Sequence, residues 1–131
     1  MELLHAKLTE QIIGLCIKVH RALGPGFVEK MYEEAVCIEL QKAGVKFERQ
    51  KEIVVYYEGR EIGRHRLDLL VESLVILELK TAKAIEDVHL AVSRSYLRAA
   101  NLELALAINF ARPTIEVKRV VESRNHENAK G

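Results

Sequence analysis

Cysteine, proline and tryptophan are scarce in this sequence, which has two cysteines, two prolines and no tryptophan among its 131 residues. Cys16 and Cys37 lie among apolar residues at helical spacing, which predicts two buried free thiols. No second cysteine or histidine lies at ligand spacing from either one, so a zinc site is not expected. The two cysteines therefore indicate neither a disulfide framework nor a redox role.

Excess charge of one sign and long apolar runs are also missing. The formal net charge is +1, so any nucleic-acid-binding surface has to be a local patch rather than a global polycation. No apolar run approaches the roughly 20 residues of a membrane span, and the N-terminus lacks the pattern of a signal peptide. We therefore expect a cytoplasmic protein with no membrane segment.

The composition that is present is that of an ordinary globular domain, with 49% hydrophobic and 30% charged residues. A chain of this length can bury about two-thirds of its unfolded surface in one core. We predict a single domain over residues 1–121, followed by a polar tail over residues 122–131 that frays.

Hydrophobic periodicity divides the chain into eight elements. Helical spacing predicts a first helix with Thr9 as its N-cap and Gly24 as its stop, whereas a period of two predicts strands. The expected elements are helices over 8–24 and 27–43, strands over 46–57, 61–71 and 74–80, a helix over 86–100, and strands over 102–111 and 115–121. This order indicates an α/β or α+β fold in which helices cover a central sheet.

Two carboxylates and a lysine interrupt the most apolar part of the chain, "DLLVESLVILELK" at residues 68–80. Burying a charge is expensive unless the charge is paired or bound to a metal. Because side chains alternate along a strand, Glu78 and Lys80 share a face with Ile76. The charges of this stretch therefore call for a specific explanation.

The register of the two strands decides whether the carboxylates meet. If residues 72–74 form the connection, Val71 faces Val75 in an antiparallel pair, and Asp68 then lies opposite Glu78. Directly opposed side chains have Cβ atoms roughly 4.5–5.5 Å apart, where like charges repel. Either one acid is then protonated or a cation lies between the two.

Two interpretations of these charges stay open from spacing alone. In the first, Asp68 and Glu78 bind Mg²⁺, which keeps several waters and leaves positions for a phosphate, while Lys80 steadies a water or the developing charge. In the second, Asp68 pairs with Arg66 or Lys80 in an ion-pair row at a sheet edge, because charge networks also resemble active sites.

The helices offer further polar candidates. Glu29 lies at the rim of an apolar helix face and in the first helical turn, where a carboxylate favours the helix dipole. Tyr32 is better explained as a core aromatic residue. On the third helix one face carries His89, Val92, Ser93 and Tyr96, and Arg94 and Arg98 lie one turn apart, either to bind phosphates or as a solvated face. We assign no role to His5, His20, His65 and His126.

Three sequence blocks together resemble a known family. "ALGPGFVEKMYEEA" resembles the signature of the GxxExxY family, through Gly26, Glu29 and Tyr32. "RLDLLV" followed by "VILELK" resembles the D…ExK core of the PD-(D/E)xK nuclease superfamily, to which that family is assigned. "HLAVSRSYLRAANLELALAINF" resembles the next block of the family. The resemblance runs from about residue 9 to residue 121.

The resemblance implies a restriction-endonuclease-like αβββαβ core, here with an extra N-terminal helix and a C-terminal strand. It also implies that Asp68, Glu78, Glu29 and the main-chain carbonyl of Leu79 bind Mg²⁺ or Mn²⁺. Lys80 would position or activate the water, so that Lys80, Asp68 and Glu78 form the catalytic group. DNA or RNA would be the substrate.

One departure from the family keeps alternatives open. Relatives commonly read "HxxQ" in the third helix, but this chain has Val92 at the last of these positions, and Val92 cannot hydrogen-bond; Ser93 is a partial substitute. The leading hypothesis is a metal-dependent nuclease. The alternatives are a catalytically inactive nuclease-fold module that binds nucleic acid or a partner protein, and a domain that assembles as a homodimer. The basic residues expected to contact nucleic acid are Arg66, Lys83, Arg94 and Arg98.

Overall fold

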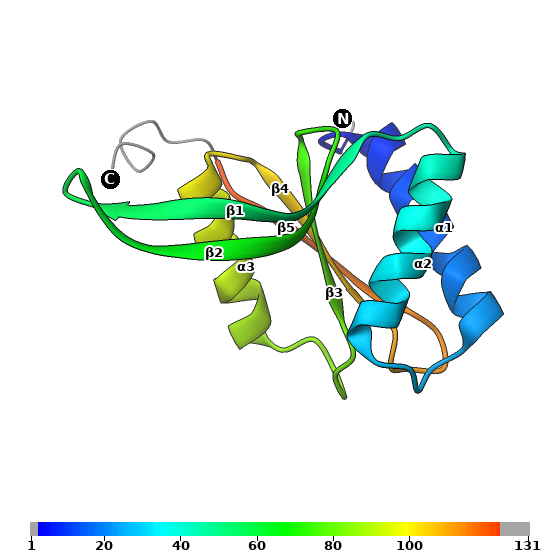
Figure 1. The fold of residues 1–131 in the computed structure, drawn as a ribbon. Coiled ribbons are helices and arrows are strands. Elements are labelled where there is room, and N and C mark those ends of the chain that lie inside the picture. Colours follow the sequence, from blue (N-terminus) through cyan, green and yellow to red (C-terminus); the bar gives the residue numbers. More distant parts are fainter. Residues whose placement is uncertain (1–2, 124–131) are drawn as a thin grey trace.

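A computed structural model describes residues 3–123 of the chain and confirms the expected order of helices and strands. Two helices come first, then three strands, a third helix and two further strands (Figure 1). Their bounds are α1 (Ala6–Leu23), α2 (Glu29–Lys42), β1 (Phe47–Tyr57), β2 (Arg60–Val71), β3 (Val75–Lys80), α3 (Asp87–Ala100), β4 (Leu104–Asn109) and β5 (Glu116–Val121).

A mixed sheet forms the middle layer of the fold. Its strand order is β1-β2-β3-β4-β5, with β3 and β4 parallel and the other neighbours antiparallel. Helices α1 and α2 cover one face and α3 covers the other (Figure 1). The predicted α+β architecture, a central mixed sheet flanked by helices, is therefore confirmed, and β5 is an edge strand.

Each face of the sheet has its own hydrophobic core. Leu77 and Leu79 of β3 pack with α1 and α2, whereas Ile76 packs with Leu97 of α3, as strand alternation predicts. The two cores differ in extent, because α2 buries five of its side chains and α3, of the same length, buries two. Helix α3 thus has fewer fully buried side chains than α2, although its partly buried Leu90, Tyr96, Ala99 and Ala100 also pack on its core.

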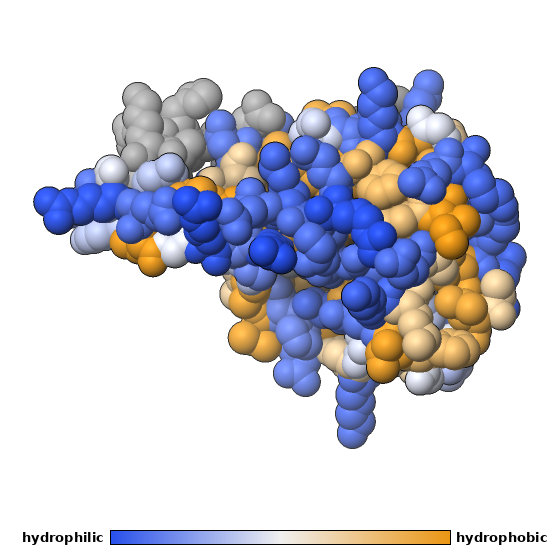
Figure 2. Space-filling model, viewed as in Figure 1, coloured by the Kyte–Doolittle hydropathy of each residue, from blue (hydrophilic) through white to orange (hydrophobic). Residues whose placement is uncertain are grey.

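The hairpin of β1 and β2 projects beyond the rest of the sheet (Figure 1). Glu58 and Gly59 form its turn with φ values of 49° and 76°, and Tyr57 pairs with Arg60. Positive φ at both central positions is the backbone of a two-residue hairpin turn that matches strand twist. The turn joins the two strands expected over 46–57 and 61–71, and the projecting hairpin has a largely hydrophilic surface (Figure 2).

The predicted N-cap at Thr9 is wrong, because α1 begins at Ala6 and its N-cap residue is His5, four residues before Thr9. The buried Thr9 hydroxyl instead donates to the Ala6 carbonyl, at 3.1 Å. The helix extends upstream because Leu4 and Leu8 continue its apolar face and pack on the core. The predicted stop is confirmed, since the Gly24 N–H donates to the His20 carbonyl at the helix end.

Three other expectations concern burial and the chain end. Cys16 and Cys37 are buried free thiols, as predicted. Within residues 3–123, none of the helices is both long and apolar enough to cross a membrane. Most of the predicted polar tail, residues 124–131, lies outside the described residues.

Candidate active site

The carboxylates meet at a fork where β2 separates from β3. The two strands pair through Val71↔Val75 and two further pairs, ending at Leu69↔Leu77. The predicted facing of Val71 and Val75 is confirmed, whereas the ladder ends before the expected pair of Asp68 and Glu78. One step further, Asp68 Oδ2 accepts a hydrogen bond from the Leu79 N–H at 2.9 Å. A side chain thereby supplies the acceptor at the point where main-chain pairing has ended.

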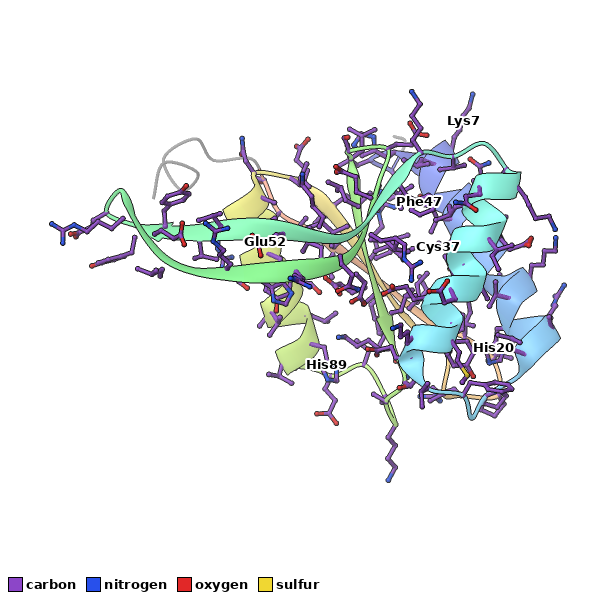
Figure 3. All side chains as sticks on the ribbon, in the orientation of Figure 1. Lys7, His20, Cys37, Phe47, Glu52 and His89 are labelled. Carbon is purple, nitrogen blue, oxygen red and sulfur yellow. The ribbon has the colours of Figure 1, made fainter. Side chains whose placement is uncertain are left out.

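A pocket of about 140 Å³ lies at this fork. Strands β2 and β3 and helix α3 contribute most of its wall, and the first residue of α2 closes one side. His89, which is labelled in Figure 3, marks the α3 wall. The lining residues are Glu29, His65, Arg66, Asp68, Glu78, Leu79, Lys80, His89, Val92, Ser93 and Tyr96. The structure thus brings the predicted catalytic residues Asp68, Glu78 and Lys80 together with Glu29.

Glu78 is the most strongly perturbed group of the pocket. Its side chain is 7% exposed, and its Oε1 is buried without a hydrogen-bond partner among the described residues. Burial and then the negative charge of Asp68 raise the pKa of Glu78 to about 9, although Lys80 opposes the shift. The fold therefore places two carboxyl groups where both can be ionised only if positive charge lies nearby.

Glu29, at the start of α2, interacts electrostatically with Asp68 and Lys80 of the pocket. It is an exposed residue at the start of α2, a position that favours a carboxylate near the helix dipole. Even so, the pKa of Glu29 is raised, first by burial of the carboxyl group in the pocket and then by the charge of Asp68. Lys80 and a hydrogen bond from the Thr81 backbone oppose the rise. Glu29 thus belongs electrostatically to the pocket.

The donor set fits a hard divalent cation. Carboxylate and carbonyl oxygens are the ligands that Mg²⁺ and Mn²⁺ prefer, and the buried Glu78 Oε1 without a partner is an oxygen that a cation would satisfy. Within residues 3–123, however, no group of three or more His, Cys, Asp or Glu side chains is arranged as a metal cluster. Asp68 and Glu78 are the paired acids here, and the further ligands Glu29 and the Leu79 carbonyl stay predictions.

His65, to which no role was assigned from the sequence, forms part of the pocket wall together with Tyr96 of the predicted α3 face. The rings of His65 and Tyr96 are stacked, with centroids 3.7 Å apart and planes at 14°. Burial and then the charges of Glu78 and Asp68 raise the pKa of Tyr96, whereas burial lowers the pKa of His65. Both rings are therefore uncharged near neutral pH.

The predicted face of α3 does line the pocket. Ser93 is buried there, next to Val92, which is 40% exposed. His89 also caps the start of α3, because its Nδ1 accepts a hydrogen bond from the Glu86 N–H at 2.9 Å in the capping box. An imidazole that accepts at Nδ1 carries its proton on Nε2.

The four predicted nucleic-acid-binding residues lie in different surroundings. Arg66 lines the pocket, whereas Lys83 and Arg94 are exposed outside the lining. Arg98 pairs with Glu122 at 3.7 Å. Arg66 is thus the only one of the four that lines the described pocket.

The signature tyrosine orients the start of α2. The hydroxyl of the fully buried Tyr32 donates to the Gly24 carbonyl at 2.5 Å and accepts from the Phe27 N–H at 3.3 Å. Its ring stacks on Phe110 at 4.5 Å. Tyr32 is a core aromatic residue, as predicted, and it ties the loop before Glu29 to the sheet.

Comparisons with known proteins agree with this geometry. A family model described as the PD-(D/E)XK nuclease superfamily matches residues 6–120. The crystal structure of SSO0001 resembles this fold with a TM-score of 0.58 at 14% sequence identity, over 77% of this chain. The chain spans 53% of the length of SSO0001, and at this identity the likeness concerns the fold alone. No curated protein matches the chain in sequence.

Proposed function

The chain belongs to the PD-(D/E)XK nuclease superfamily, and we propose that it is a metal-dependent nuclease that hydrolyses phosphodiester bonds of DNA or RNA. Nucleases of this superfamily generally use divalent metal ions. The observation that supports the proposal best is the buried Glu78 oxygen without a hydrogen-bond partner, beside Asp68 and Lys80. This arrangement is unfavourable in the protein alone and becomes favourable once a cation is bound.

Five residues of the pocket have a proposed task in catalysis. Asp68, Glu78, Glu29 and the carbonyl of Leu79 hold Mg²⁺ or Mn²⁺. When bound, the cation stabilises the negative charge that builds up on the phosphate oxygens. Lys80 donates hydrogen bonds to the attacking water and keeps it in line with phosphorus.

The reaction is a hydrolysis. The water releases a proton as its oxygen forms a bond to phosphorus, the bond from phosphorus to the leaving sugar oxygen breaks, and that sugar oxygen takes up a proton, so that one water is consumed overall. Arg66, at the pocket, and the exposed Lys83 and Arg94 provide charges for neighbouring phosphates of the strand.

Cleavage of labelled single- and double-stranded DNA and RNA with Mg²⁺ or Mn²⁺ tests the proposal. Asp68→Ala and Lys80→Ala should each abolish cleavage, as should a chelator. Glu10→Gln and Lys7→Ala are matched controls, since both residues are exposed on α1 and Lys7 lies far from His89 (Figure 3). Cleavage that persists unchanged in both pocket variants would exclude this site.

A second candidate function is a nuclease-fold module that binds nucleic acid without cutting it. Val92 favours this function, because it places an aliphatic side chain in the pocket wall where relatives commonly have a polar one. Binding that weakens steeply with salt, without turnover under any divalent metal, would support the module. Turnover that is lost in Lys80→Ala would exclude it.

A further inference from the structure

Helix α2 and strand β1 are joined by hydrogen bonds to a buried acid. Glu33 is 7% exposed; its Oε1 accepts from Gln50 Nε2 and its Oε2 from Arg49, both at 2.9 Å. The neighbouring Glu34 is exposed and accepts from Arg49 at 2.7 Å, not from Gln50. A buried carboxylate with two donors contributes more than an exposed ion pair, because removing it leaves its partners unsatisfied.

Gln50 has a backbone conformation that is rare for its residue type. Its φ is 50° although it lies inside β1, and the left-handed region is unfavourable for residues with a Cβ atom. The register continues on both sides, with Arg49↔Leu69 and Lys51↔Leu67. Gln50 therefore lies directly opposite Asp68.

At Gln50 the two faces of the hairpin change places: the face that packs towards α1 and α2 before the kink points towards α3 beyond it. Before the kink, Phe47 of β1 and Leu69 of β2 pack towards α1 and α2; beyond it, Ile53 and Leu67 pack towards α3. Simple alternation would keep all four residues on one side, because their numbers are all odd. The left-handed residue thus turns the hairpin over at the position where Asp68 lies.

We propose that Glu33 is a positioning residue for Asp68, which it holds by fixing the left-handed backbone of Gln50. A pocket of about 560 Å³ is lined by Glu33, Gln50, Asp68 and Glu29 together, so the bonded pair borders the candidate active site. With the kink fixed, Asp68 Oδ2 reaches the Leu79 N–H and the carboxyl group stays beside Glu78. Its consequence for cation binding rests on the proposed function; the positioning itself does not.

Amide hydrogen exchange in a chelator tests the positioning without metal. In Glu33→Ala, the Leu79 amide should exchange roughly three- to tenfold faster relative to amides of β4, the factor expected for one weakened hydrogen bond. Glu34→Ala is the matched control, because it removes a partner of Arg49 and leaves Gln50 bonded. An unchanged Leu79 rate in Glu33→Ala, or an equal change in the control, overturns the proposal.

Substitutions of Gln50 test whether the backbone carries the effect. Gln50 is exposed, so both variants retain the core. Gln50→Ala should accelerate Leu79 exchange as Glu33→Ala does, whereas Gln50→Gly should do so less, because glycine adopts positive φ readily. Adding Gln50→Gly to Glu33→Ala should slow the exchange again. A glycine variant that exchanges as fast as the alanine variant contradicts the role of the kink.

Calorimetry with Mn²⁺ separates this inference from the proposed function. Wild-type protein should bind the ion, and Glu33→Ala should bind it roughly tenfold more weakly, as is usual when a group that orients a ligand is removed. Wild-type protein that binds no Mn²⁺ while Leu79 responds as expected would support the positioning of Asp68 and refute the metal site. Measurable Mn²⁺ binding of equal affinity in both proteins would overturn the claim that this positioning strengthens cation binding.

Discussion

Replacing Glu78 with glutamine should make the metal-free protein more stable at neutral and alkaline pH. Burial and the charge of Asp68 raise the pKa of Glu78 from its ordinary 4.5 to about 9 in the folded chain. Below pH 4.5 the group is protonated in both the folded and the unfolded chain. Between pH 4.5 and 9 the unfolded chain releases this proton and the fold retains it, so the free energy of unfolding falls as the pH rises.

The size of the effect follows from the shift. Each pH unit in this window lowers the free energy of unfolding by about 1.4 kcal/mol, so the loss between pH 4.5 and pH 7 is about 3 kcal/mol. Glutamine has nearly the same shape as the protonated acid and does not ionise. The difference between Glu78→Gln and wild type should therefore grow from near zero at pH 4.5 to about 3 kcal/mol at pH 7.

Urea unfolding followed by circular dichroism, in a chelator at several pH values from 5 to 9, measures this difference. Groups that both proteins share contribute equally and cancel in the comparison, and Glu10→Gln, an exposed control on α1, should follow the wild-type curve. Adding Mg²⁺ at pH 8 should stabilise wild type and leave Glu78→Gln unchanged, because a ligand stabilises only a state that binds it. Parallel curves for wild type and Glu78→Gln from pH 5 to 9 would refute the reasoning.

Three further predictions concern other parts of the fold. Burial raises the pKa of Cys16 to about 12 and that of Cys37 to about 11. Neither thiol should therefore react with iodoacetamide at pH 8 until urea unfolds the chain. Rapid labelling of the folded protein would contradict this prediction. Tyr32→Phe removes the donor to the Gly24 carbonyl and should lower the free energy of unfolding by about 1–3 kcal/mol, measured by urea titration. Val92→Gln places an amide in the pocket wall and should increase nuclease turnover while changing stability by less than about 0.5 kcal/mol; no gain in cleavage would show that Val92 does not limit activity.

Much of the fold could be predicted because local signals agree with the tertiary structure. The two periods, 3.6 for helices and 2 for strands, placed the helices and strands in the correct order, and Gly24 correctly marked the end of α1. The connection after Val71 set the register of β2 and β3, which brings Asp68 and Glu78 together. The start of α1 was missed because a good N-cap residue, Thr9, also fits inside a helix once its hydroxyl binds a carbonyl one turn back.

The missed part of the pocket has a different cause. Regular alternation along β2 predicts that His65 and Asp68 point to opposite faces of the strand. In the structure, however, His65 lines the same pocket as Asp68 and stacks on Tyr96. The exchange of faces at Gln50 explains the difference, and it depends on a left-handed residue held by Glu33 of a distant helix. No short-range pattern encodes such a contact. Sequence alternation therefore predicts a site reliably only as far as the strand stays regular.

The smaller number of fully buried side chains in α3 than in α2 has a consequence for how a nucleic-acid strand would enter the pocket under the proposed function. Helix α3 has two fully buried side chains and α2 has five, so transient detachment of α3 should require less free energy than global unfolding. Because α3 forms one wall of the pocket, its detachment would widen the entrance for a nucleic-acid strand. Its return to the sheet would then enclose that strand. Native-state exchange in low urea should therefore release α3 amides before those of α2, and the reverse order would contradict this route of entry.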